Sequence, residues 1–284
     1  MTLEDRGAAP GYRAAATLPL RVELVRQLRR NRTLLTLGFL ALLPFLLWLA
    51  FSIGRDGSNR GGATLVDLAT SSGLNFTVFA LFSTVSFLLV VVVALFFGDT
   101  VASEASWSSL RYLLAAPVPR GRLLRQKAEV AALLSVCALV LLPAVAMAVG
   151  VVAYGAGDLV SPTGQSLGFL PAAARLLLVP AYLVLQLAWV AGLALLLSVS
   201  TDAPLGAVGG AVMLSILSQI LETISALGDL RDFLPTRFNS AWADLLASPI
   251  DWTHLASGAF SGLAYATVFG LAAWRRFATK DITS

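Results

Sequence analysis

Residues 130–153, VAALLSVCALVLLPAVAMAVGVVA, form an apolar run without a charged side chain. A helix needs about 20 predominantly apolar residues to cross the hydrocarbon layer of a bilayer. Five more stretches with charge-free cores occur, at 33–53, 73–98, 176–200, 205–223 and 255–274. None shows the alternating polarity of a membrane β-strand. The sequence therefore predicts an all-α integral membrane protein with six transmembrane helices.

Composition supports a chain that consists mainly of membrane spans. Apolar residues make up 57% and charged residues 13% of the 284 residues, whereas soluble proteins carry about 25% charged residues. We expect one transmembrane domain over residues 1–284. It comprises an N-terminal segment at 1–32, a six-helix bundle at 33–274 and a tail at 275–284, which leaves no room for a separate catalytic domain.

The distribution of Lys and Arg predicts the orientation. Six spans place the N-terminus, the segment 99–129, the turn 201–204 and the C-terminus on one side, which carries fifteen basic residues against five on the other. Short cytoplasmic loops are enriched in Lys and Arg. Both termini are therefore expected in the cytoplasm of a cell-membrane protein, and the basic pI is assigned to these loops and not to nucleic-acid binding.

Residues 18–30, LPLRVELVRQLRR, are expected to form an amphipathic helix. Its leucines recur every four residues, with arginines off that line. Such a helix lies in the membrane interface. It serves either as an anchor or as a contact with a partner subunit.

The segment 99–129, DTVASEASWSSLRYLLAAPVPRGRLLRQKAE, is longer than a simple loop requires. A short helix is predicted from Ser103 to Ala115, ended by the prolines that follow. One face carries Trp107, Leu110 and Leu114. The other carries Glu104, Ser108 and Arg111. A loop with snorkelling arginines is the simpler interpretation, but the length and the amphipathic helix favour a docking element.

The loop 224–254 is expected to form one or two short helices that cap the bundle on the opposite side, since it combines Phe and Trp residues with polar ones. A direct role in substrate release is the alternative.

Two GxxxG motifs occur within the spans. Gly206 and Gly210 lie in the fifth span, and Gly258 and Gly262 in the sixth. Such motifs allow helices to approach closely. They either form a dimer interface or pack one bundle, and we expect tight packing through Gly206 and Gly210.

Enzyme chemistry finds little support in the sequence. Gly155-Ala-Gly157-Asp158 matches the GxGD pattern of intramembrane aspartyl proteases, but no other span supplies a second aspartate. His254 is the only histidine, and no cluster of metal ligands accompanies it. A nucleotide-binding P-loop is also missing from the sequence.

An ion-coupled carrier or a channel is the more serious alternative. Such proteins often place ionisable residues inside their spans. The charge-free span cores argue against ion coupling.

The order of these features resembles the type-2 ABC exporter permeases. The resemblance is strongest at 104–120, EASWSSLRYLLAAPVPR, and extends to 274–282, WRRFATKDI. One departure is Ser108-Ser109, where the family often has Gly-Thr.

The resemblance implies an assembly of two permease and two cytoplasmic ATPase subunits surrounded by lipid, with ATP and Mg bound by the ATPase. Coupling to that ATPase would fall to Glu104, Trp107, Ser108, Leu110 and Arg111. Replacing Glu104 by Ala should then uncouple hydrolysis from export without unfolding the chain. Drug, lipid, peptide, polysaccharide and ion cargoes are all compatible with the apolar bundle.

Overall fold

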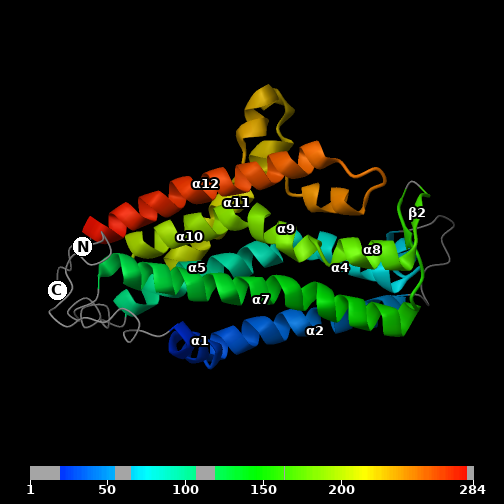
Figure 1. Ribbon diagram of the computed structural model, residues 1–284, viewed down its shortest axis with the longest axis horizontal. Coiled ribbons are helices and arrows are strands. Elements are labelled where there is room, and N and C mark those ends of the chain that lie inside the picture. Colours follow the sequence, from blue (N-terminus) through cyan, green and yellow to red (C-terminus); the bar gives the residue numbers. More distant parts are fainter. Residues whose placement is uncertain (1–19, 55–64, 107–118, 163, 280–284) are drawn as a thin grey trace.

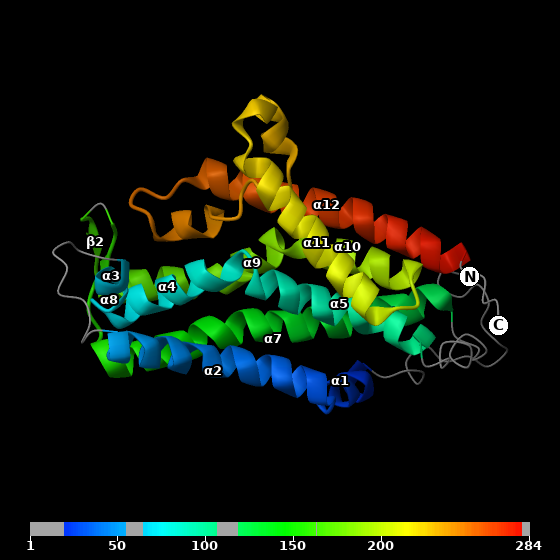
Figure 2. The same ribbon diagram turned by 180° about the vertical axis from the view of Figure 1, so that it is seen from behind.

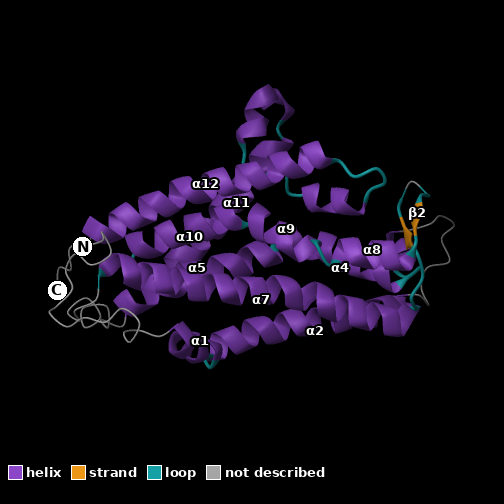
Figure 3. Cartoon of the chain, viewed as in Figure 1, coloured by secondary structure: helices purple, strands orange, loops and turns teal. Residues whose placement is uncertain are grey.

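The computed structural model describes residues 20–54, 65–106, 119–162 and 164–279. These residues form an elongated bundle of helices with one small hairpin (Figures 1 and 3). The helices and strands are α1 (Leu20–Leu28), α2 (Asn31–Gly54), α3 (Leu65–Ala69), α4 (Gly73–Val85), α5 (Leu88–Ser106), α7 (Arg120–Tyr154), β1 (Leu159–Val160), β2 (Ser166–Leu167), α8 (Phe169–Leu176), α9 (Val179–Gln186), α10 (Ala188–Ser200), α11 (Pro204–Thr223), η4 (Ser225–Phe233), η5 (Ala241–Leu246) and α12 (Trp252–Thr279).

Six helical stretches in the described chain are long and apolar enough to cross a membrane, as predicted. They are Asn31–Gly54, Leu88–Ser106, Arg120–Tyr154, Phe169–Ser200, Pro204–Thr223 and Trp252–Thr279. The all-α fold class is therefore confirmed, and the chain is a multi-pass membrane protein. The two-residue strands β1 and β2 pair antiparallel, with Leu159 opposite Leu167.

Two of the predicted spans are not continuous helices. The stretch 73–98 breaks between α4 and α5, where the side-chain amide of Gln219 donates to the carbonyl of Ser86 at 2.9 Å. The stretch 176–200 breaks at Leu187, next to Gln186, whose amide donates to the carbonyl of Asn239 at 2.9 Å. Neither break contains proline, so hydropathy alone did not indicate them. Instead, amide side chains from α9 and α11 bond main-chain carbonyls at or near the breaks.

The helix α5 forms the centre of the bundle. It lies between α7 and α10 in both views (Figures 1 and 2) and also contacts α11. Most of its side chains are buried, whereas α2 exposes a row of large apolar side chains. Such exposed apolar surface is expected where lipid replaces water as the solvent, because acyl chains are as apolar as the side chains.

The two glycine motifs behave differently. A Cβ at Gly258 would clash with Tyr182, and one at Gly262 would clash with the carbonyl of Leu185, so both glycines let α12 approach α9 within one chain. Gly206 is exposed, and a Cβ at Gly210 would meet only the flexible end of Leu197, at 3.1 Å. The expected tight packing through Gly206 and Gly210 is therefore not found within the chain.

The segment that follows α11 folds into two 3-10 helices, in line with the expectation of short helices there. η4 projects away from the bundle in Figures 1 and 2, while η5 returns to contact α8, α9 and α12. Polar side chains attach this segment to the spans: Ser218 bonds Thr236 at 2.8 Å, and Arg175 donates to the carbonyl of Ala247 at 2.7 Å.

Candidate functional site: a charged cluster joining α1, α5 and α7

Charged side chains gather where α5 ends and α7 begins, beside α1. This group is called the charged cluster below. It consists of Glu23, Arg26, Arg30, Arg32, Asp99, Glu104 and Lys127. The residues between α5 and α7, 107–118, lie outside the described part of the chain. Glu104 and Lys127 therefore lie on either side of residues 107–118, within the segment 99–129 that sequence analysis singled out.

Glu104 and Lys127 form the centre of the charged cluster. Their side chains are 6% and 4% exposed, and Lys127 Nζ lies 2.5 Å from Glu104 Oε1. Glu104 is in the last turn of α5, and Lys127 is in the second turn of α7. The pair therefore ties the two helices together at the points where the chain leaves one and enters the other.

The amphipathic helix α1 completes this ion pair. Arg26 donates to Glu104 Oε1 at 2.9 Å and to Glu23 at 3.1 Å. Gln27, which is buried, donates to Glu23 at 3.0 Å, and Lys127 Nζ lies 3.9 Å from the same carboxylate. The polar face of α1 is thus directed at the ends of α5 and α7.

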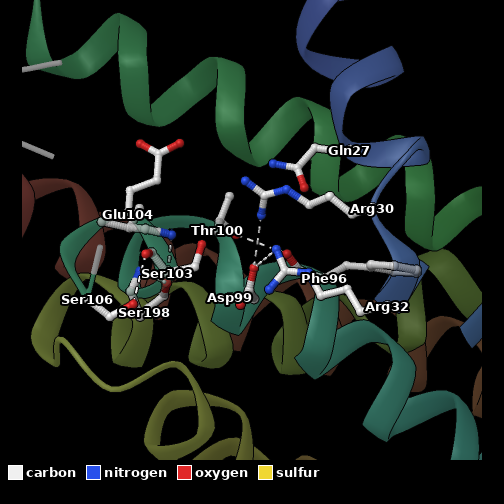
Figure 4. Close-up of polar contacts among 12 residues, drawn as sticks. Gln27, Arg30, Arg32, Phe96, Asp99, Thr100, Ser103, Glu104, Ser106 and Ser198 are labelled. Carbon is white, nitrogen blue, oxygen red and sulfur yellow. Dashed lines mark hydrogen bonds and ion pairs between the residues drawn. The ribbon is translucent and has the colours of Figure 1, made fainter. Parts of the chain in front are cut away.

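A second carboxylate lies about one turn earlier on α5. Asp99 is 7% exposed and forms ion pairs with Arg32 and, at 3.6 Å, with Arg30 (Figure 4). Burial, and then the positive charge of Arg32, lowers the pKa of Arg30, while Asp99 opposes that shift. The guanidinium still stays charged at neutral pH, because an arginine side chain has a pKa far above neutrality. Asp99 consequently joins the α1–α2 connection to α5.

Ser198 of α10 contacts the main chain of α5 (Figure 4). Its buried hydroxyl accepts hydrogen bonds from the amides of Val101 and Ala102, at 3.0 and 3.1 Å. Gly98 also allows close approach to α11, because a Cβ there would lie 3.2 Å from the amide nitrogen of Val208. The part of α5 that carries the acidic residues is therefore attached to α10 and α11 as well.

The beginning of α7 is attached to the end of α12. Arg120 donates to the carbonyl of Ala278 at 3.2 Å, and a Cβ at Gly121 would clash with the ring of Trp274. The first turn of α7 is thus held against the last turns of α12.

The charged cluster is closely packed. The cavity between Glu23, Asp99 and Lys127 measures about 20 Å³, room for about one water molecule. Such an arrangement suits a mechanical connection between helices better than the binding of a ligand.

Glu104 is the only predicted coupling residue within the described chain, since Trp107, Ser108, Leu110 and Arg111 lie outside it. Sequence analysis placed Glu104 on the polar face of a separate short helix. The structure instead places it in the last turn of α5, buried and bonded within the chain. Its expected contact with an ATPase stays a prediction. Within the chain, its carboxylate already forms ion pairs with Lys127 of α7 and Arg26 of α1.

The other members of the charged cluster were not identified from the sequence. In the sequence, Asp99 and Lys127 lie just outside the second and third predicted spans. Charged residues at the edges of apolar runs are costly to bury unless they are paired. That cost was the one indication in the sequence that these residues would form ion pairs. Which acid met which base depended on helix packing.

Comparison with known families gives one match. The model of a family described as ABC-2 family transporter protein matches residues 20–200. This range contains every residue of the charged cluster. Among curated proteins, none matches the chain.

Proposed function

Since the chain belongs to the ABC-2 transporter family, and is thus a permease of an ABC transporter, we propose that it exports its cargo with energy from ATP hydrolysed by a separate subunit. In this proposal two permease chains pair with two cytoplasmic ATPase subunits in the cell membrane. ATP and Mg bind to the ATPase. Both termini of the permease and the charged cluster face the cytoplasm.

The observation that carries the proposal is the buried ion pair of Glu104 with Lys127, which joins the two helices flanking residues 107–118. A force applied to that segment reaches α5 and α7 together. Because α5 is bound to α10 through Ser198 and to α11 at Gly98, the displacement passes into the centre of the bundle. An ATPase docked on 107–118 would in this way move the spans.

The role of α1 follows from the same contacts. Arg26 bonds Glu104 from α1, and Arg30 and Arg32 bind Asp99. The N-terminal helix would therefore move with α5 when the ATPase subunits approach each other. This assignment makes α1 part of the coupling apparatus and not solely a membrane anchor.

The test is reconstitution of the chain with an ABC ATPase subunit that co-purifies with it. We expect ATP hydrolysis by the complex to depend on the permease, and Leu110→Asp to abolish co-purification while the variant chain still inserts in the membrane. Leu230→Asp, on exposed η4, is the control and should leave the complex intact. Solute movement driven by an ion gradient in vesicles that hold only this chain would support an ion-coupled carrier and contradict the proposal.

A further inference from the structure

A polar cavity lies away from the charged cluster, beside the break between α4 and α5. It measures about 130 Å³ and is bounded by α4, the end of α11, and residues from 236 to 242. One wall is aromatic, with the rings of Phe82 and Trp242 at 4.6 Å. The other wall is charged, with Glu222 and Arg237 at 3.6 Å. The cavity plays no part in the coupling proposed above.

Both charged groups of this cavity can accept a further partner. Charge-assisted N–H···O bonds measure about 2.7–2.9 Å, so the separation of 3.6 Å between Glu222 and Arg237 is a loose ion pair. Their side chains are 27% and 39% exposed. Arg237 uses its Nε to bind Asp232 at 3.0 Å, and a guanidinium has five N–H donors in all.

Uncommitted polar groups line the same space. Within the described residues, the hydroxyl of Ser86 and the side-chain amide of Asn239 make no hydrogen bond, although both residues are partly buried. The carbonyl of Ser86 is held by Gln219. Neutral donors and acceptors therefore stand beside a positive and a negative group.

The size and position of the cavity restrict what enters it. Pockets for drug-sized ligands measure about 300–1,000 Å³, so only a small group fits into 130 Å³. Glu222 lies in the last turn of α11, and the charged helix η4 follows. Phe82, in the aromatic wall, is 52% exposed and so forms an apolar edge of the cavity. A polar cavity with an apolar rim at the end of a span suits an amphiphile.

We propose that this cavity binds the head group of a zwitterionic phospholipid. Arg237 binds the phosphate, and Glu222, whose carboxylate lies 3.6 Å from the Arg237 guanidinium, binds the ammonium group. The acyl chains lie along the exposed apolar side chains of α4 and α11. This assignment holds whichever cargo the permease moves and does not rest on an ATPase partner.

The experiment compares phosphatidylethanolamine with phosphatidylglycerol, which shares the phosphate but lacks the ammonium group. Binding to the purified full chain is measured by native mass spectrometry. Arg237→Gln should lower the affinity for both lipids about tenfold, as expected for the loss of a hydrogen bond between charged groups. Glu222→Gln should lower the affinity for phosphatidylethanolamine alone, so that the chain no longer prefers it over phosphatidylglycerol.

The controls are Arg231→Gln and Asp229→Asn, on η4 and outside the cavity lining. They should bind both lipids as the unmodified chain does. If Arg237→Gln does not fold, the ratio of phosphatidylethanolamine to phosphatidylglycerol bound by Glu222→Gln tests the proposal. An unchanged ratio, equal losses in the controls, or displacement of the lipid by equimolar soluble phosphoethanolamine would overturn the proposal.

Discussion

At the scale of single residues, Glu104 illustrates how environment changes the role of a side chain. Its carboxylate is buried against Lys127 and bonded by Arg26. Burying a charge is expensive unless the partner and the remaining hydrogen bonds are in place. The structure therefore revises one expectation: Glu104→Ala should damage the fold of the chain and not only its coupling.

The ion pair can be tested by a double-mutant cycle. Glu104→Gln and Lys127→Met should each lower the free energy of unfolding, by up to about 3–5 kcal/mol, because each removes the nearest partner of a buried charge and leaves only Arg26 beside Glu104 or Glu23 beside Lys127. The double variant should recover a large part of that loss. Thermal or denaturant unfolding in detergent measures all three.

The matched control for this cycle is Arg125→Gln. Arg125 pairs with Glu129 on the same helix, but the two side chains are 63% and 44% exposed. Exposed pairs contribute about 0–1 kcal/mol, so this variant should unfold nearly as the unmodified chain does. Purely additive losses in the double variant would show that Glu104 and Lys127 do not stabilise each other.

At the scale of helices, the contact of α12 with α9 depends on glycine. A Cβ at Gly262 would clash with the main chain of Leu185, whereas one at Gly270, on the same helix, meets no atom within 4 Å. The sequence marked Gly262 as part of a GxxxG motif but left open whether it packs within one bundle or between two chains. The neighbouring helix shows that Gly262 packs within the chain and that Gly270 does not need to be glycine.

This difference yields a paired prediction. Gly262→Ala should lower the free energy of unfolding by about 1–3 kcal/mol, the usual cost of overpacking a close contact. Gly270→Ala should raise it by about 0.5–1 kcal/mol, because alanine loses less backbone entropy in a helix. Unfolding of the two purified variants in the same detergent provides the comparison; equal effects would contradict the close approach of α12 and α9.

At the scale of the whole molecule, the hairpin and the turn between α10 and α11 lie at opposite ends of the bundle (Figure 1). Gln165 is exposed in the hairpin region, and Asp202 is exposed in the turn. In the proposed orientation, which follows from the excess of basic residues, the end with Asp202 faces the cytoplasm. The two ends should therefore differ in their access to reagents that do not cross membranes.

Single cysteines test this arrangement. In a Cys137→Ser background, Gln165→Cys should react with a membrane-impermeant maleimide on intact cells, and Asp202→Cys only after permeabilisation. This labelling pattern is expected because the excess of basic residues at the end with Asp202 favours the cytoplasmic side. The reverse pattern would invert the proposed orientation, and labelling of both on intact cells would break the six-span topology.

Much of the architecture was predictable from the sequence because the criterion is local. A stretch such as 130–153 spans the bilayer through its own length and apolarity, whatever its neighbours are. The same local criterion located α11 and α12 closely. It merged α4 with α5, because the break at Ser86 is bonded by Gln219, a residue far along the chain.

The candidate site was predictable only in part. Helical spacing placed Glu104 on one face with Ser108 and Arg111, and its contact was expected to be with an ATPase subunit. Its nearest observed partner is Lys127, and Arg26 reaches it from α1. Spacing along one helix identifies neighbours on that helix and carries no information about residues that arrive from others.

The class of protein and the number of spans follow from the amino-acid sequence alone, because hydrophobic transfer into a bilayer acts on each segment separately. The tertiary structure adds that Glu104 joins Lys127, that Gly262 meets Leu185 and that Glu222 pairs with Arg237 beside a cavity. These contacts depend on how the helices are rotated and shifted against one another. Packing sets that register, since side chains of different helices must interlock and buried charges must be paired.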